Sequence, residues 1–278
     1  MIDPRTPIDQ VPLVFLDVET TGLAATLGDR ICEVAALRCQ NGEVTDALQR
    51  LVNPQRSITP GAYRVHGIDE EMLRDAPLFA EVADDLLALL ENAVFVGHNA
   101  PFDLGFLHSE FARIGMRMPP LIALDTLLLA RRHYRLPGYS LTRLAAALGV
   151  EVEGRAHRAM VDALLTRGVF RHIVDELRPR GVRTLADFLA AQGGVLNIAP
   201  SPNIEVPPVI QEALSRGKFL YLRYLSQDGV ESERLVRPIR VMPRNGNLFL
   251  MAHCLMRDAE RSFRLDRILD IDLVERFE

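Results

Sequence analysis

The feature that most constrains this chain is an apolar stretch that ends in two acidic residues. Residues 14–22 read VFLDVETTG, which predicts a buried strand that ends in a polar turn. A strand covered on both faces rarely tolerates acids, yet Asp17 and Glu19 lie two residues apart and so point to the same face. Two carboxylates held together raise each other's pKa unless a cation lies between them. The stretch therefore predicts either a plain turn with a solvated Glu19 or half of a metal site.

The composition is that of an ordinary globular protein, with 48% hydrophobic and 25% charged residues. A length of 278 residues favours two domains. The net charge of −5 excludes a chain that is basic throughout, so nucleic acid would have to bind at a local patch. Lys218 is the only lysine, and the abundant arginine suits phosphate, although genome composition explains it equally well.

Cysteine usage and hydropathy bear on the location of the protein. Cys32, Cys39 and Cys254 are widely spaced and form no Cys-x-x-Cys pair, which predicts reduced thiols rather than a disulfide framework or a zinc site. The first ten residues do not resemble a signal peptide, and no apolar run approaches the length of a membrane span. We therefore expect a soluble cytoplasmic protein that does not associate with a membrane.

The first half of the chain predicts an α/β layer fold with a mixed sheet. Residues 30–38 and 44–52 flank Asn41-Gly42, a strong hairpin signal, so the first three strands should form an antiparallel meander. Residues 60–69 are expected to be irregular. Further on, apolar spacing predicts strands over 93–97 and 121–124, and helices over 79–90, 102–114, 141–148 and 158–177.

The pattern changes after Pro179. Thr184 is expected to cap a short helix that ends at Ala191, and the Gly/Pro-rich residues that follow read as a linker. A helix over 209–215 then precedes several short strands, which predicts a small β-barrel or curled sheet with a hairpin at Asn245-Gly246. The expected strands cover 219–225, 234–241, 248–253, 261–265 and 269–274, and the expected parts of the chain are a domain over 1–178, a helix and linker over 179–207, and a domain over 208–278.

Three later residues could complete a site with the two acids. Asp103 follows a strand at the start of a helix, Asp162 lies inside a helix, and His157 precedes that helix. Each has a plain structural explanation when taken alone, as a helix N-terminal acid, a solvated helix residue and a loop histidine.

Taken together, the motifs resemble a known family. Asp17-x-Glu19-Thr20-Thr21-Gly22, Gly97-His98-Asn99-x-x-Phe102-Asp103 and His157-x-Ala159-x-x-Asp162 follow each other in the order found in DnaQ-like, or DEDDh, 3′–5′ exonucleases, which include DNA polymerase III epsilon proofreading subunits. The resemblance covers about residues 13–173. It implies a ribonuclease-H-like mixed sheet flanked by helices, and release of nucleoside monophosphates from the 3′ end of DNA, expected to be single-stranded.

The resemblance also implies a role for each motif residue. The catalytic metal ligands would be Asp17, Glu19, Asp103 and Asp162, holding two divalent cations, Mg²⁺ or Mn²⁺, with Asp17 bridging them. Hard oxygen ligands suit these ions, and a pair of them stabilises both the attacking and the leaving oxygen of a phosphodiester. His157 would be the general base, since an imidazole titrates near neutral pH. The substrate-binding residues implied by the family pattern are Thr20, Thr21, His66, His98 and Asn99.

The last part of the chain resembles a WYL domain, an Sm/SH3-like β-barrel. The matching stretches are FLYLRY (219–224), ERLVRP (233–238), GNLFL (246–250) and RSFRLDRI (261–268), with Leu248-Phe249-Leu250 in place of the naming triplet. The resemblance implies nucleic acid or a nucleotide effector as ligand. Arg237, Arg261, Arg264 and Arg267 are the candidate phosphate-binding residues.

Alternation along the strand limits this second site. Arg261 and Phe263 should lie on one face and Arg264 on the other, so the four arginines cannot all line one pocket. The alternative is that charged pairs such as Glu233–Arg234 and Asp266–Arg267 are structural or solvated.

Two other functions remain open at this point. One is a ligand-responsive regulator that binds nucleic acid, and the other is an exonuclease that acts on RNA or short oligoribonucleotides. Residues 193–208 show no convincing motif for a polymerase or sliding clamp, so we expect a free-standing role in DNA repair, turnover or defence.

Overall fold

A computed structural model describes residues 2–23, 25, 28–154, 156–196, 206–226, 230–244 and 247–274. The chain divides into two compact units, the first containing residues 1–23 and 30–200 and the second consisting chiefly of residues 201–278. In the part of the chain that the structure describes, none of the helices is both long enough and apolar enough to cross a bilayer.

The first unit is built on a five-stranded sheet of order β3-β2-β1-β4-β5. β1 (Leu13–Thr20), β2 (Ile31–Gln40) and β3 (Glu43–Leu51) form the expected antiparallel meander, and Asn41 and Gly42 both have positive φ at its tight turn. β4 (Val94–Gly97) and β5 (Ala123–Asp125) continue the sheet in parallel with β1. The sheet is therefore mixed, as the sequence predicts.

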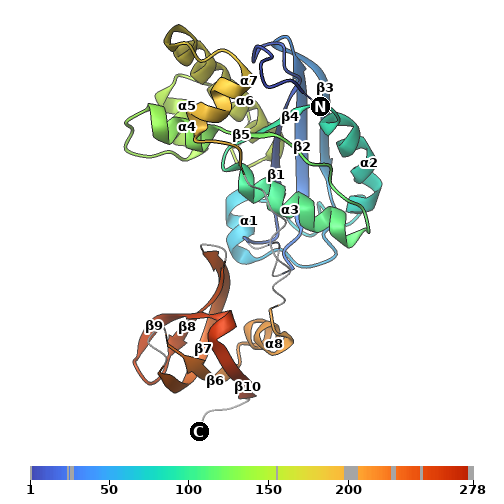
Figure 1. Ribbon diagram of the computed structural model, residues 1–278. Helices are drawn as coiled ribbons and strands as arrows, with labels where there is room; N and C mark the ends of the chain where they lie inside the picture. Colours follow the sequence, from blue (N-terminus) through green and yellow to red (C-terminus); the bar gives the residue numbers. More distant parts are fainter. Residues whose placement is uncertain are drawn as a thin grey trace. The chain divides into compact units, whose positions relative to one another are not determined.

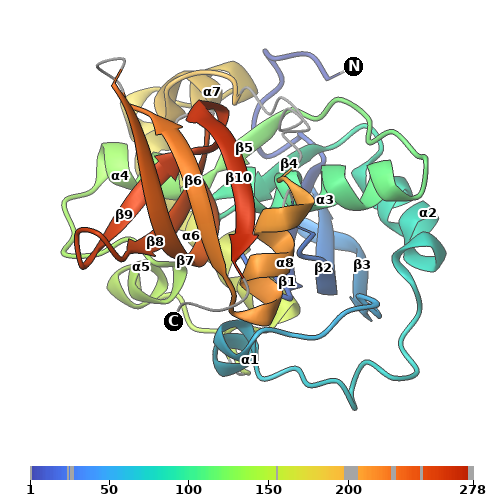
Figure 2. The same ribbon diagram turned by 90° about the horizontal axis from the view of Figure 1, so that it is seen from below.

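Helices cover both faces of this sheet (Figures 1 and 2). α2 (Phe79–Leu90) and α3 (Ala100–Arg113) lie on one side and pack together through the edge-to-face rings of Phe79 and Phe111. α6 (Ala159–Leu177) lies on the other side, where its Phe170 ring centroid is 5.8 Å from that of Phe15 on β1. The odd-numbered side chains of β1 therefore face α6. Two short helices, α4 (Thr126–His133) and α5 (Leu141–Ala147), pack onto α6.

One short helix was not expected from the sequence. Residues 60–69, predicted to be irregular, contain α1 (Pro60–His66). Thr59 Oγ1 accepts a hydrogen bond from the amide of Ala62, Pro60 occupies the first turn, and Gly67 ends the helix at φ +71°. These are ordinary helix start and stop signals. The prediction was wrong because it relied on helical periodicity, and the segment is too short to show a helical period.

The helix that follows Thr184 belongs to the first unit. α7 (Leu185–Gln192) begins with the expected Thr184 cap, and its Leu185 and Phe188 are buried in the core of that unit. Gln192 donates to the carbonyl of Ala123 and accepts from the amide of Asp125, which satisfies the outer edge of β5. The boundary at residue 178 expected from composition therefore falls inside this unit.

The second unit is an antiparallel sheet with one helix packed on it. α8 (Pro208–Arg216) precedes five strands in the order β10-β6-β7-β8-β9. The Tyr224 ring of β6 packs edge-to-face on Phe263 of β9, so the sheet curls strongly. In the described residues β9 and β10 are not paired, so the sheet is curled rather than closed, which is one of the two forms expected from the sequence. The Asn245-Gly246 turn lies outside the described residues. The strands are β6 (Phe219–Leu225), β7 (Glu231–Arg244), β8 (Asn247–Cys254), β9 (Ala259–Arg264) and β10 (Ile268–Val274).

Candidate metal centre and active site

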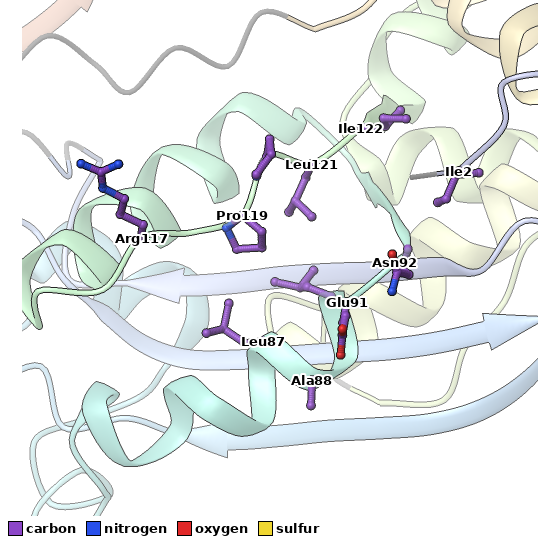
Figure 3. A pocket seen from close by; sticks show the side chains of 12 residues that line it. Ile2, Leu87, Ala88, Glu91, Asn92, Arg117, Pro119, Leu121 and Ile122 are labelled. Carbon is purple, nitrogen blue, oxygen red and sulfur yellow. The ribbon is translucent and has the colours of Figure 1, made fainter.

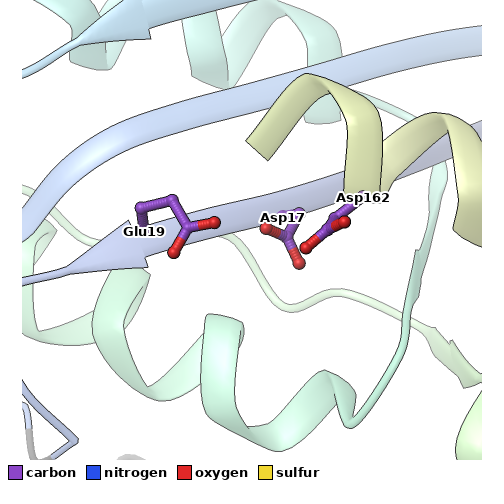
Figure 4. Close-up of side chains that lie close together, drawn as sticks. All are labelled: Asp17, Glu19 and Asp162. Atoms are coloured by element: carbon purple, nitrogen blue, oxygen red, sulfur yellow. The ribbon is translucent and has the colours of Figure 1, made fainter. Parts of the chain in front are cut away.

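Three carboxylates meet where the end of β1 faces the start of α6. Asp17 and Glu19 are odd-numbered residues of β1 and so point toward α6, which contributes Asp162 from its first turn. One carboxylate oxygen of each residue lies within 4.8 Å of the others, and Figure 4 shows the three groups turned toward a common space. The pairing of β1 with β2 shifts register between Glu19 and Thr20, and such a bulge re-aims side chains at the end of a strand.

Asp103 reaches the same strand end from α3. β1 pairs with β4 only over residues 13–15, so its later amides lack a strand partner on that side. Asp103 is buried, and its Oδ1 accepts a hydrogen bond of 3.1 Å from the amide of Val18, between Asp17 and Glu19. The structure therefore places Asp103 beside the cluster but not among its three converging residues.

The acids at this site have raised pKa values. Burial, with the neighbouring carboxylates Asp103 and Asp162 next in importance, raises the pKa of Asp17 well above its usual range. Burial is likewise the main reason that the pKa of Glu19 rises to about 8 and that of Asp103 to about 8. The pKa of Asp162 is also raised, first by burial. A set of hard oxygen donors with an uncompensated charge fits divalent cations, which favour carboxylate oxygen.

His157 stands at the edge of this cluster. Its side chain is 52% exposed, and Nδ1 lies 3.8 Å from Oδ2 of Asp162. Its backbone has φ +61°, a left-handed conformation that is uncommon for residues other than glycine. The backbone amide donates to Asp162 Oδ1 over 3.4 Å, so Asp162 lies against both the backbone and the ring of His157. The histidine and the acids that the sequence singled out thus lie together in space.

A part-buried ion pair that the sequence did not reveal lies next to His157. Glu33 on β2 is the register partner of Glu19 and is fully buried. Arg158 donates two hydrogen bonds to its carboxylate, of 2.9 and 2.8 Å. Burial raises the pKa of Glu33, but the hydrogen bonds from Arg158, Gln49 and the Ala159 amide outweigh it and leave the pKa below the usual value. The only signal in the sequence is an acid within the apolar strand 31–37.

The predicted substrate-binding residues are held in different ways. The Thr20 hydroxyl donates to the Gly22 carbonyl, and the Thr21 hydroxyl accepts from the Arg30 amide, so both take part in the turn that ends β1. Asn99 caps α3 at φ +70° and its side chain is exposed.

His66 and His98 use both ring nitrogens within the protein. His66 Nε2 donates to the Thr20 carbonyl, and its Nδ1 accepts from the Ile68 amide. His98 Nε2 donates to the Tyr139 carbonyl, and Nδ1 lies 3.0 Å from Thr126 Oγ1. A hydrogen bond between a nucleotide and a nitrogen of either ring would require one of these interactions to be given up.

The four arginines of the second unit do not share one face. Arg237 pairs in register with His253, and Arg264 with Phe249, so both lie opposite the buried face that carries Leu250 and Ala252. Arg261 is in register with Ala252 and lies on the same face of β9 as the buried Phe263. Arg267 is half-buried in the short helix that precedes β10. The separation expected from alternation is confirmed.

The suggested ion pair between Glu233 and Arg234 takes another form. Arg234 donates to the backbone carbonyl of Glu233 rather than to its carboxylate. The side chain of Asp266, the suggested partner of Arg267, lies outside the described residues.

The first unit also has a separate groove of about 560 Å³ (Figure 3). Its lining is largely apolar and includes Leu87 from α2, Ile122 and Ala93, which directly precedes β4. Since β4 runs parallel to β1, this groove lies at the opposite end of the sheet from the acidic cluster.

Comparison with known proteins agrees with this geometry. The family model of the exonuclease domain RNase_T matches residues 14–170, and that of the WYL domain matches residues 205–273. The chain is 39% identical over 189 residues to a DNA polymerase III subunit epsilon-like protein of Rhodobacter capsulatus, covering 66% of this chain and 27% of the relative. It is 36% identical over 173 residues to the 3′-5′ exonuclease DinG of Bacillus subtilis, covering 62% of this chain and 18% of the relative.

A solved structure gives the same picture. Exonuclease X in complex with 5′ overhanging duplex DNA matches with a TM-score of 0.51 and 27% identity, over 65% of this chain and 99% of that one. The residues that match the exonuclease family model, 14–170, include all four acids and His157. The two curated relatives are much longer proteins, and this chain spans 27% and 18% of their lengths.

Proposed function

Because the chain belongs to the RNase_T exonuclease family, we propose that it is a metal-dependent 3′–5′ exonuclease that releases nucleoside monophosphates from the 3′ end of single-stranded DNA. One observation carries the proposal. Asp17, Glu19 and Asp162 converge at the end of β1 with Asp103 and His157 beside them. The 3′-5′ exonuclease name of DinG and the DNA in the Exonuclease X complex support the direction and the substrate.

The residues divide the chemistry between them. Asp17, Glu19 and Asp162 would hold divalent cations, Mg²⁺ or Mn²⁺, and Asp103 would complete the set through the oxygen that does not accept from Val18. Bound cations supply positive charge to the phosphate oxygens and lower the pKa of bound water. His157 would take the proton of the attacking water on Nε2, since Nδ1 is directed at Asp162. The exposure of this ring leaves room for water beside it.

The second unit is proposed to bind nucleic acid or a nucleotide effector. Its match to the WYL domain and its exposed Arg237 and Arg261 support this role. The buried, unpaired thiols of Cys32, Cys39 and Cys254 agree with a cytoplasmic location. We place the protein in DNA repair, turnover or defence without a polymerase or clamp partner.

Degradation of end-labelled oligonucleotides tests the activity. With Mg²⁺ or Mn²⁺, a 5′-labelled single strand should shorten to a ladder, and EDTA should stop the reaction. Asp17→Asn should lower kcat on the order of 10²–10³-fold, because metal stabilisation of the transition state is worth several kcal/mol. Asp84→Asn, which changes an exposed acid on α2, is the matched control.

Two outcomes would contradict the proposal. Full activity of Asp17→Asn would exclude the metal mechanism, and degradation of a 3′-labelled strand that leaves its label on the shortened fragments would exclude the direction. Running single- and double-stranded DNA and RNA in parallel separates a DNA exonuclease from the alternative RNA exonuclease.

A ligand-responsive regulator is the second candidate, favoured by the WYL domain match. It predicts that a fluorescent oligonucleotide binds the full chain equally well when Asp17→Asn removes activity, and that Arg237→Ala weakens binding. If Arg237→Ala and Arg261→Ala leave both binding and degradation unchanged, this reading fails.

A further inference from the structure

The start of α6 is held by an acid from a neighbouring strand. Arg158 is the N-cap residue of α6, and its own side chain makes no capping hydrogen bond. Glu33 on β2 supplies the missing acceptor, because its Oε2 accepts from the amide of Ala159 over 3.1 Å. The same carboxylate accepts the two-pronged contact of the Arg158 guanidinium and a third side-chain bond from Gln49. One buried carboxylate thus fixes the backbone and the side chain of the first helical residues.

We call the contacts of Glu33 with Arg158 and with the Ala159 amide the Glu33 clamp, and it lies directly beside His157. On the C-terminal side of His157, the next residue, Arg158, is hydrogen-bonded to Glu33. On the N-terminal side, the backbone amide of His157 donates to Asp162. The left-handed φ of +61° at His157 is uncommon for a residue other than glycine. Contacts on both sides keep it in place. The direction in which the imidazole leaves the backbone therefore depends on Glu33 and Arg158.

A purely structural purpose explains this pair poorly. Burying the Glu33 carboxylate costs free energy of desolvation even beside the partly exposed Arg158, and apolar residues of similar volume often serve stability as well or better. Glu33 also lies in register with Glu19 and so adds negative charge to a site that already repels it. The neighbours of Glu33 on the same face of β2, Ala35 and Leu37, are apolar. An acid at position 33 is thus unfavourable for the strand and useful for the helix start.

We propose that Glu33 and Arg158 are positioning residues for the proton transfer by His157. The inference rests on the proposed function, since it assigns a role to the residues that orient its general base. Neither side chain needs to touch the substrate. A displacement of about 1 Å can cost a reaction about 100-fold, so loss of the clamp should appear in kcat and not in substrate binding.

The chain contains a second pair that serves as a matched control. Arg30 donates two hydrogen bonds, of 2.7 and 2.9 Å, to the buried Glu110 on α3, and Glu110 also accepts from the amide of Ile31. The chemistry is the same as at Glu33, but the helix that Glu110 ties to the sheet carries Asp103 and not His157. Changing Glu110 to Gln should lower stability as the change at Glu33 does, without altering the proton transfer.

The test is a double-mutant cycle on oligonucleotide degradation. Glu33→Gln should lower kcat at least tenfold with KM changed less than threefold. Arg158→Lys, which keeps the charge but loses the fork, should retain more activity than Arg158→Ala. In the background of His157→Ala, adding Glu33→Gln should lower kcat by less than twofold, because the clamp then has no base to position. Glu110→Gln should change kcat by the same small factor in the wild-type protein and in His157→Ala.

A readout without turnover accompanies the kinetics. The ¹H–¹³C signal of the His157 ring, identified by its absence in His157→Ala, should shift in Glu33→Gln and stay in place in Glu110→Gln. Equal effects of Glu33→Gln with and without His157, a KM effect in place of a kcat effect, or an unmoved ring signal would each overturn the inference. If His157→Ala itself keeps full activity, the proposed function fails instead, so the two failures are distinguishable.

Discussion

At the scale of single residues, the acids at the end of β1 are held where their charge is unfavourable without cations. Glu19 and Asp103 each have a pKa of about 8 in the metal-free fold, chiefly because they are buried. In the unfolded chain such groups titrate near pH 4. Between these pH values the folded protein therefore binds more protons than the unfolded chain, and the free energy of unfolding falls as pH rises. The favourable contribution of these protons is complete below about pH 4 and is lost as pH rises through 8.

Divalent cations should replace the lost protons. We expect Mg²⁺ or Mn²⁺ to raise the Tm more at pH 8 than at pH 5.5, because protons compete with metal for the carboxylates. A cation at 100 times its Kd stabilises by about 2.7 kcal/mol. Thermal melting with metal or with EDTA at both pH values measures the effect.

Asp17→Asn provides the residue-scale comparison for this experiment. It removes one of the repelling charges, so in EDTA at pH 8 its Tm should exceed that of the wild type, and the rise with metal should be blunted. Asp84→Asn should melt as the wild type does under each condition. A metal effect that is the same at both pH values, or that Asp17→Asn leaves intact, would contradict this prediction.

At the scale of elements, the loop between α5 and α6, which leads to His157, packs closely on α6. Val150 lies at the start of the loop that leads to His157, and it packs against Gly168 of α6. A Cβ on Gly168 would clash with Cγ1 of Val150, whereas a Cβ on Gly105 of α3 would meet nothing within 4 Å. Both glycines lie inside helices, where glycine costs roughly 0.5–1 kcal/mol relative to alanine.

The two glycines should therefore respond in opposite directions to the same change. Gly105→Ala should raise the free energy of unfolding by about 0.5–1 kcal/mol, because helix propensity improves without a clash. Gly168→Ala should lower it by about 1–3 kcal/mol, the usual cost of overpacking. Denaturant titration measures both, and stabilisation by Gly168→Ala would show that Val150 does not pack as described.

At the scale of the whole molecule, the chain consists of two units with separate hydrophobic cores, and only the first contains the proposed active site. The acids and His157 belong to the first unit, and the core of the second is formed by α8 and its curled sheet. Because the proposed cations bind the first unit alone, metal should stabilise one unit and not the other.

We expect two thermal unfolding transitions, and Mg²⁺ should raise the midpoint temperature of only one of them, that of the first unit. Leu222→Ala, a change in the core of the second unit, should lower only the other transition, since large-to-small core changes cost about 2–5 kcal/mol. Differential scanning calorimetry with and without metal resolves the two. A single transition that shifts as a whole with Mg²⁺ and with Leu222→Ala would show that the units unfold together.

Local features of this protein were predictable from sequence because they depend on neighbouring residues. Asn41-Gly42 predicted the hairpin, Thr184 predicted its helix cap, and the even spacing of Asp17 and Glu19 placed both on one face. The order of the acidic motifs predicted the family, which the RNase_T match confirms. Among the local elements, α1 was missed, because its two turns show no clear period.

The sequence by itself determined most of the helices and strands, their order and the acids of the site, because hydrogen-bond periodicity and side-chain alternation are properties of adjacent residues. Only the tertiary structure decided which distant groups meet. Packing of α6 on β1 brings Asp162 to Asp17, and it joins Arg158 to Glu33 across 125 positions of the chain. The early end of β4 exposes the Val18 amide to Asp103. Such meetings depend on how helices settle on a sheet, and no local pattern encodes them.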